Sequence, residues 1–168
     1  MSTRSRARQV VLQMLFQYDL NLEAATEQQH QFISTRLNKV QGLVRFATQL
    51  VGGVRSNKDT LDVAVQAAAN NWSIPRMAVT DRNILRLGAY ELLHTDTPPS
   101  VVINEAIELA KRFGSNQSSG FVNGILDRVL ESSKPEIEIQ SDPKIEDQPS
   151  SEPAESFKGS EQTTDETL

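Results

Sequence analysis

Three arginines precede the first apolar run of this chain, and their type and spacing suggest phosphate binding. Arg4, Arg6 and Arg8 alternate with small residues, and no acidic side chain comes before them. The planar guanidinium group binds phosphate through paired hydrogen bonds. On a helix these positions would flank both sides of an apolar stripe, because each residue turns the helix by ~100°. We therefore expect a frayed or extended arm that becomes ordered against a phosphate backbone; a basic end that only aids solubility would have the same sequence.

A second group of basic and polar residues lies in a loop near the end of the apolar region. Backbone N–H groups at a helix start, together with small polar side chains, hold phosphates well. Amide side chains also read the base edges that single-stranded RNA exposes. Phe121 has two interpretations, since its ring can stack on a base or pack in the core one turn before Ile125. The candidate RNA-binding residues of this loop are Lys111, Arg112, Asn116, Gln117, Ser118 and Phe121.

Two Glu-x-x-His pairs, Glu27 with His30 and Glu91 with His94, match part of the ligand pattern of di-iron helix bundles. The first pair lies in a glutamine-rich stretch without an apolar stripe, and the second lies where its helix ends. We therefore expect surface residues there, with no metal and no cofactor. The sequence also lacks cysteine, a glycine-rich phosphate loop before a lysine, and a Gly-x-Ser-x-Gly elbow. These features favour a protein that is not an enzyme.

The elements that position these residues are predicted to be helices throughout residues 1–132. Apolar residues recur every three or four positions, and no stretch alternates over the length of a strand. Thr80 is expected to cap a helix with Asp81 in its first turn, and Gly114 to end the next helix. The pattern predicts an all-α fold of six to seven helices over residues 7–22, 27–36, 39–54, 61–69, 81–96, 100–113 and 121–130.

Charge is unevenly distributed between residues 1–132 and residues 133–168. The second segment carries ten carboxylates against three lysines, with four prolines and one aromatic residue, whereas the first carries 14 basic and 12 acidic side chains. Such a segment buries too little apolar surface to fold, so we expect a disordered acidic tail. It either aids solubility or mimics nucleic acid and competes for the basic body. Without cysteine, secretory signal or membrane span, the chain is expected to be cytoplasmic.

Several longer runs carry a family resemblance. They are the arginine segment followed by LFQY, DRNILRLGAYEL beginning at Asp81, VINEAIELAK beginning at Val102, and FVNGILD beginning at Phe121. In this order they resemble the NusB family of transcription antitermination factors over roughly residues 4–131. The VINEAIELAK and FVNG runs together are highly specific, and the tail lies outside the resemblance.

The resemblance implies two small packed helical bundles that bind RNA. It implies recognition of the single-stranded boxA element in ribosomal RNA leaders, as a heterodimer with ribosomal protein NusE. This pair would join other Nus factors on RNA polymerase and affect termination; a homodimer is also compatible with the fold. Arg4, Arg6 and Arg8 fall on the family's arginine-rich start, and Gln117 and Phe121 on its second RNA-contacting region. Some relatives carry an acidic residue at the position of Gln117, so its role transfers less directly than the loop's location.

For the NusE partner, the resemblance points to Tyr18, Leu22 and Asp81, although Tyr18 and Leu22 could equally belong to the core. A different function is also compatible with the helices, since a related fold recruits RNA for ribosomal RNA cytosine methyltransferases. No catalytic domain or cysteine nucleophile follows residue 132, which disfavours that alternative.

Overall fold

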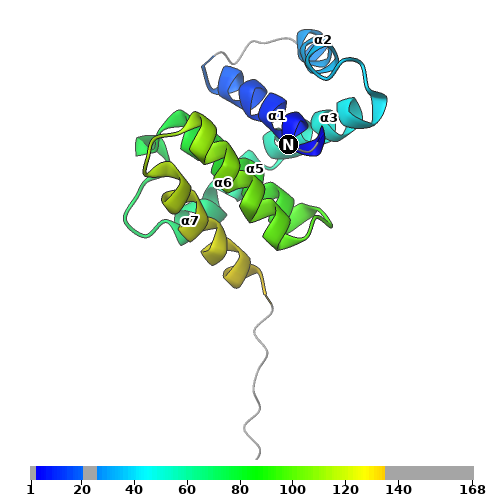
Figure 1. The fold of residues 1–168 in the computed structure, drawn as a ribbon. Coiled ribbons are helices and arrows are strands. Elements are labelled where there is room, and N and C mark those ends of the chain that lie inside the picture. Colours follow the sequence, from blue (N-terminus) through cyan, green and yellow to red (C-terminus); the bar gives the residue numbers. More distant parts are fainter. Residues whose placement is uncertain (1–2, 21–25, 135–168) are drawn as a thin grey trace, which may run out of the picture. The chain divides into compact units, whose positions relative to one another are not determined.

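The computed structural model describes residues 3–20 and 26–134, which form seven α-helices and one 3₁₀ turn, with no strand in those ranges (Figure 1). The all-α prediction is therefore confirmed. The predicted disordered tail lies outside the described residues from position 135 onward. The last helix ends at Ser133, one residue beyond the predicted boundary between the helical region and the tail at residue 132. The elements are α1 (Thr3–Leu20), α2 (Thr26–Arg36), α3 (Gln41–Ser56), α4 (Lys58–Ala68), η1 (Ile74–Arg76), α5 (Val79–His94), α6 (Pro99–Phe113) and α7 (Ser118–Ser133).

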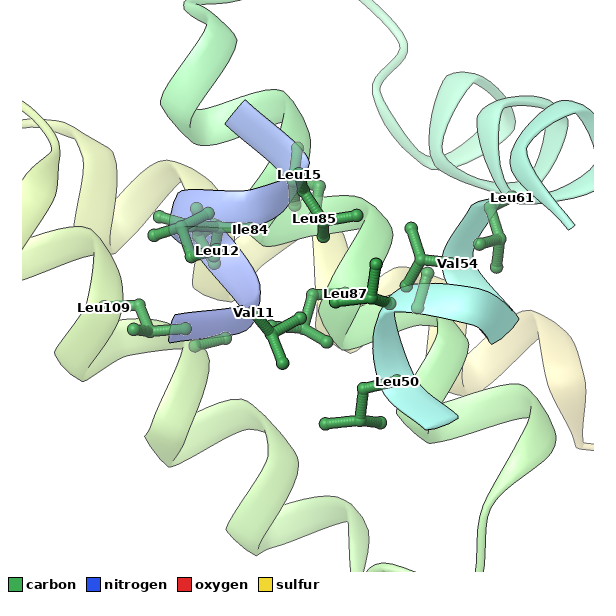
Figure 2. Close-up of a cluster of buried hydrophobic side chains, with 14 of the residues drawn as sticks. Val11, Leu12, Leu15, Leu50, Val54, Leu61, Ile84, Leu85, Leu87 and Leu109 are labelled. Carbon is green, nitrogen blue, oxygen red and sulfur yellow. The ribbon is translucent and has the colours of Figure 1, made fainter. Parts of the chain in front are cut away.

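The helices form two groups that both contact α5. Helices α1, α2 and α3 pack on one another, and α4, α6 and α7 pack around α5, which also contacts α1 and α3. Figure 2 shows leucine and valine side chains of α1, α3 and α4 meeting those of α5 and α6. Leu61, Ile84 and Leu85 are completely shielded from solvent in this core. Within the described ranges, no helix is long and apolar enough to cross a bilayer.

Each helix begins one to four residues from its predicted start, and two of these differences are informative. The helix expected from Lys39 begins at Gln41, because Asn38 and Lys39 adopt left-handed backbone conformations with φ of 53° and 57°. Asparagine tolerates that conformation better than most residues. The helix expected to be capped by Thr80 begins at Val79, with Ala78 at the cap position and no side-chain cap hydrogen bond. Asp81 does lie in the first turn of α5, as expected.

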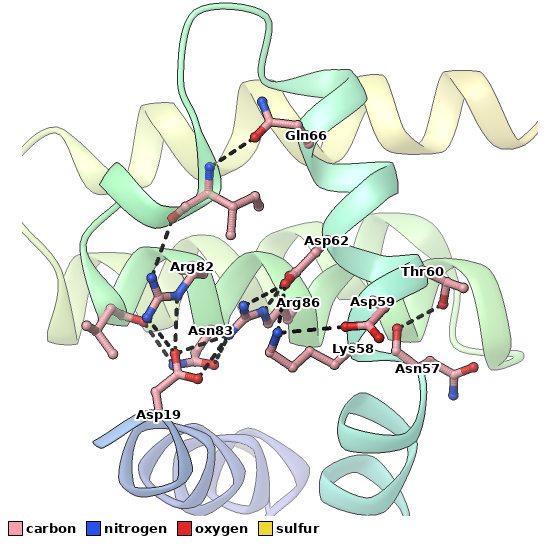
Figure 3. Close-up of polar contacts among 12 residues, drawn as sticks. Asp19, Asn57, Lys58, Asp59, Thr60, Asp62, Gln66, Arg82, Asn83 and Arg86 are labelled. Carbon is pink, nitrogen blue, oxygen red and sulfur yellow. Dashed lines mark hydrogen bonds and ion pairs between the residues drawn. The ribbon is translucent and has the colours of Figure 1, made fainter. Parts of the chain in front are cut away.

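A polar network fixes α5 against α1 and α4 (Figure 3). Arg86 is 4% exposed; its Nε and Nη2 donate to the two carboxylate oxygens of Asp62 at 2.6 and 2.8 Å, and its Nη1 donates to Asp19. Arg82 also donates to Asp19, at 2.8 Å. Burial opposes ionisation of Asp62, but its hydrogen bonds with Arg86 and the charges of Arg86 and Lys58 outweigh that effect and lower its pKa. The network therefore joins three helices through ionised groups.

Candidate nucleic-acid interface

The arginine segment belongs to α1 and is not an extended arm. Helix α1 begins at Thr3, so Arg4, Arg6 and Arg8 all have helical backbone and project in different directions. The prediction of an extended lead-in was wrong for this reason. The helix extends from Ala7 towards the N-terminus and includes the arginines, because packing of the buried Ala7 against the core holds the first turn in place.

Arg8 is buried in an ion pair, which removes it from the phosphate-binding surface. Its Nε and Nη2 donate to Glu91 at 2.8 and 2.6 Å, and Nη1 lies 3.9 Å from Glu105. Burial opposes the charge on Arg8, but the hydrogen bonds and negative charge of Glu91, followed by Glu105, outweigh it and raise the pKa of Arg8. The side chain is 2% exposed. RNA therefore cannot reach Arg8 in this structure, which contradicts the prediction that Arg8 contacts RNA. The residue instead links α1 to α5 through Glu91.

Arg4 and Arg6 remain exposed at the start of α1. The guanidinium of Arg4 lies 5.2 Å from the centre of the Phe46 ring, and Nη2 of Arg6 donates to the carbonyl oxygen of Arg36 at 3.0 Å. Neither forms an ion pair with a carboxylate in the described part of the chain. Arg36 is exposed as well and its guanidinium covers the Phe32 ring. We call Arg6 and Arg36 the α1–α2 cationic cluster, because Arg6 contacts the backbone of Arg36; Arg36 was not expected from the sequence.

The loop between α6 and α7 places most of its predicted residues at the surface. Lys111, Arg112, Asn116 and Gln117 are exposed, and Lys111 pairs with the exposed Glu108 at 2.8 Å. Two further cations therefore lie one turn before a loop with exposed amide side chains. This is the arrangement that the sequence predicted for an RNA-binding loop.

Ser118, in contrast, is 1% exposed and shapes the loop from inside. Its Oγ accepts the backbone N–H of Ser115 at 2.8 Å. A Cβ on Gly114 would lie 2.5 Å from Cβ and Oγ of Ser118, so glycine is required there by close approach and not by a left-handed backbone. The expectation that Ser118 binds RNA does not fit its burial; the residue sets the loop conformation.

Phe121 lies at the start of α7, partly buried against the core. Its ring meets that of Trp72 edge to face, with centroids 5.6 Å apart and planes at 72°. Trp72 is 55% exposed. The core interpretation of Phe121 therefore holds in part, since the ring packs against the core and against Trp72, and stacking of the ring on a base stays a prediction.

The predicted partner-binding residues differ in their exposure to solvent. Tyr18 is buried; its hydroxyl donates to Gln29, and the guanidinium of Arg55 covers its ring at 3.9 Å. The core interpretation of Tyr18 is therefore the one that the structure supports. Leu22 lies outside the described residues. Asp81 is partly exposed, and its Oδ1 makes no hydrogen bond with any group that the structure describes.

An aromatic groove that sequence reasoning missed lies between the two cationic regions. Arg36 of the α1–α2 cationic cluster lines it, and Phe113, which directly precedes the Gly114 loop, lines it from α6. The one sequence signal was Phe16, an aromatic residue on α1 that lies off the buried stripe and is 37% exposed. The groove has a volume of about 430 Å³ and is lined by Leu12, Gln13, Phe16, Gln17, Phe32, Arg36, Thr80 and Phe113.

The Glu-x-x-His pairs show no metal-binding arrangement. Both carboxylate oxygens of Glu91 accept hydrogen bonds from Arg8. The ring of His94 stacks on Tyr90 with centroids 5.2 Å apart. His30 is exposed, and the side chain of Glu27 lies outside the described part. Among the residues that the structure describes, no three or more histidine and carboxylate side chains gather as metal ligands do. Buried Glu91 is thus a structural anion, which corrects its expected surface position.

Comparisons with known proteins identify relatives over nearly the whole helical region. A family model described as "NusB family" matches residues 5–131. The transcription antitermination protein NusB of Anaeromyxobacter dehalogenans is 44% identical over 128 residues, which cover 76% of this chain and 90% of that protein. The structure of T. maritima NusB matches with a TM-score of 0.68 and 37% identity, covering 76% of this chain and 90% of that chain.

A solved complex adds a binding context for a relative. It is described as antitermination factors NusB and NusE in complex with double-stranded RNA. Its matching chain has a TM-score of 0.71 and 26% identity, and the match covers 79% of this chain and 98% of that chain.

Proposed function

The chain belongs to the NusB family of non-enzymatic transcription antitermination proteins, and from this we propose that it binds boxA-type single-stranded RNA together with NusE. The RNA would be the leader of a ribosomal RNA transcript. The pair would join other Nus factors on transcribing RNA polymerase, in the cytoplasm, and change termination. A homodimer stays a prediction.

The observation that carries this proposal is the continuity between the two cationic regions. Arg6 donates to the backbone of Arg36, Arg36 lines the aromatic groove, and Phe113 lines the same groove beside the Lys111–Gln117 loop. Single-stranded nucleic acid is bound by surfaces that combine cations for the backbone with aromatic rings for the bases. The exposed ring of Phe16 supports base stacking between the α1–α2 cationic cluster and the Lys111–Gln117 loop.

NusE is proposed as the partner because a family relative has been solved with NusE and RNA. On this chain, Asp81 directly follows Thr80, which lines the aromatic groove. An RNA strand in the groove would therefore lie next to a protein bound at Asp81. This proximity supports a composite site in which NusE and this chain contact one RNA.

The first test of this function removes the two exposed arginines of α1. Replacing both Arg4 and Arg6 with alanine should weaken binding of boxA RNA and make it less sensitive to salt. Each lost phosphate contact lowers the slope of log affinity against log salt by roughly 0.7 on single strands, so the pair should lower it by about 1.4. Fluorescence anisotropy titrations across a range of KCl concentrations measure this slope.

Arg45→Ala is the matched control, since Arg45 is an exposed arginine on α3 that lines a different hollow, with His30 and Gln41. Its salt slope should equal that of the unmodified chain. Identical affinity and slope for the Arg4/Arg6 double variant would show that α1 does not contact the RNA.

A second test addresses the partner. Asp81→Lys should reduce the gain in RNA affinity that NusE provides by about fivefold or more, the lower end of ordinary coupling between ligands. RNA binding by the chain alone should not weaken. Affinities measured with and without saturating NusE give the coupling directly.

Asp59→Lys is the matched control for charge reversal, because Asp59 also lies in the first turn of its helix, α4. Both reversals place a cation near a helix N-terminus, where negative charge is favoured. Asp81 is excluded from the NusE site if the two variants retain the same coupling as the unmodified chain. A pull-down with NusE and a short boxA RNA tests the overall function.

A further inference from the structure

We propose that Trp72 and Phe121 form the walls of a pocket for a single nucleobase, which extends the RNA site to the connection between α4 and η1. The inference rests on the proposed RNA binding and names a further RNA-binding residue for it, Trp72. The pocket lies between that connection and the exposed side of α7. It has a volume of about 260 Å³ and is lined by Ala69, Asn70, Asn71, Trp72, Gly120, Phe121, Gly124, Ile125 and Arg128.

The aromatic walls suit a flat ring. Trp72 and Phe121 lie with their planes at 72°, so a base stacked on one ring would present its edge to the other. Stacked and edge-to-face contacts are both favourable between aromatic groups. The 55% exposure of Trp72 leaves a large apolar surface uncovered in the described part of the protein.

The floor of the pocket is open because α7 carries glycine there. A Cβ added at Gly120 or Gly124 would meet no heavy atom within 4 Å. These two glycines lie one turn apart, on either side of Phe121 in the sequence, so no side chain fills the space beside its ring. The volume is below the ~300–1,000 Å³ of pockets for drug-sized ligands, which favours one ring system over a larger molecule.

Trp72 is held in position by its backbone. Gln66 donates from Nε2 to the carbonyl oxygen of Trp72 at 2.8 Å and accepts the N–H of Ile74 at 3.0 Å. The N–H of Trp72 donates to the carbonyl oxygen of Ala69 at 2.8 Å. The exposed tryptophan therefore sits on a fixed turn, and binding a base would cost little ordering of the backbone.

Polar groups at the rim match the rest of a nucleotide. Arg128 is exposed, and its Nη1 donates to the carbonyl oxygen of Ala68 at 2.9 Å, which fixes the guanidinium beside the pocket. Its other N–H groups can donate to a phosphate. Asn70 and Asn71 supply exposed amides, which can donate to and accept from a base edge. Phe121 connects this pocket to the Lys111–Gln117 loop, so a strand bound at the loop continues into it.

The test replaces Trp72 and uses boxA single-stranded RNA as the probe. Trp72→Ala should weaken binding roughly 5- to 100-fold, the usual loss of a stacked base. The salt slope should stay unchanged, because stacking releases no counterions. Trp72→Phe should retain most of the affinity. Val63→Ala, which removes another exposed apolar side chain outside the pocket, should retain all of it.

A second variant and the fluorescence of Trp72 test the pocket without removing a side chain from the structure. Gly124→Leu should fill the pocket and weaken RNA binding while favouring the helix, since glycine is a poor helix former. Trp72 is the single tryptophan of the chain, so its emission should change on RNA binding in the unmodified protein.

The outcomes separate this inference from the proposed function. If the unmodified chain, with NusE present, binds no boxA RNA, both fail. If it binds RNA but Trp72→Ala binds equally well, or the emission responds to NusE and not to RNA, the base pocket alone is overturned.

Discussion

Replacing Glu91 with alanine is expected to lower the free energy of unfolding by about 3–5 kcal/mol, the usual cost of leaving a buried charge without its partner. Arg8 and Glu91 have side chains that are only 3% and 2% exposed, and they share two hydrogen bonds. After the change, the remaining described carboxylate near Arg8 is that of Glu105, at 3.9 Å. Urea unfolding followed by circular dichroism measures the effect as a lower midpoint.

Glu108→Ala is the matched control, because Glu108 forms an exposed ion pair with Lys111 at 2.8 Å. That change should cost less than ~1 kcal/mol. Replacing both members of the buried pair, as Arg8→Met with Glu91→Leu, should restore much of the lost stability, since two apolar side chains of similar size leave no unpaired charge. If Glu91→Ala cost no more than Glu108→Ala, the buried ion pair would not fasten α1 to α5.

The second large effect is expected at Arg86. Arg86→Met should lower the free energy of unfolding by about 2–4 kcal/mol, somewhat less than loss of a fully buried partner, because Asp19 and Asp62 are 16% and 19% exposed and keep other cations nearby. Asp19 retains Arg82 at 2.8 Å, and Asp62 retains Lys58 at 3.2 Å. Denaturant unfolding at neutral pH gives this difference.

The loss at Arg86 should depend on pH in a defined direction. The folded-state pKa of Asp62 lies below its ordinary value of 3.8, so its contribution to stability is fully present above that value and is lost as the pH falls through the folded pKa. Without Arg86, burial acts on Asp62 with less opposition and its pKa rises. The stability gap between the two proteins should therefore be wide at pH 6 to 7 and should narrow as the pH falls below 3.8 through the folded pKa of Asp62. If the stability gap did not depend on pH, Arg86 would stabilise the fold through packing and not through its ion pair with Asp62.

Helix α5 shows how far periodicity predicts burial. Its apolar residues indicated one buried face, and Ile84, Leu85 and Ala89 are indeed in the core. Arg86 and Glu91 are buried too, because α5 is packed by α1, α3, α4, α6 and α7 on several sides. A helical period assigns polar residues to solvent, and only the tertiary contacts reveal that these two meet opposite charges from distant helices.

Only the part of the candidate site that depends on local sequence was predicted, because tertiary contacts determine the rest. The location of the loop with Asn116 and Gln117 followed from local composition, and both residues are exposed. The buried role of Arg8 could not be predicted, because Glu91 lies 83 positions away in the sequence. Phe16 and Trp72 gave weak signals as aromatic residues outside the buried stripes. The aromatic groove at Phe16 and the pocket at Trp72 form only where segments far apart in the sequence meet.

The burial of one arginine beside two exposed ones also affects how relatives of this protein are compared. Exchange of arginine for lysine at position 4 or 6 keeps a cation within reach of phosphate. At position 8 the same exchange replaces a planar fork, which matches both oxygens of Glu91, by a single ammonium group. A lysine at that position in another sequence would thus signal a rearranged interior and carry no information about its nucleic-acid preference.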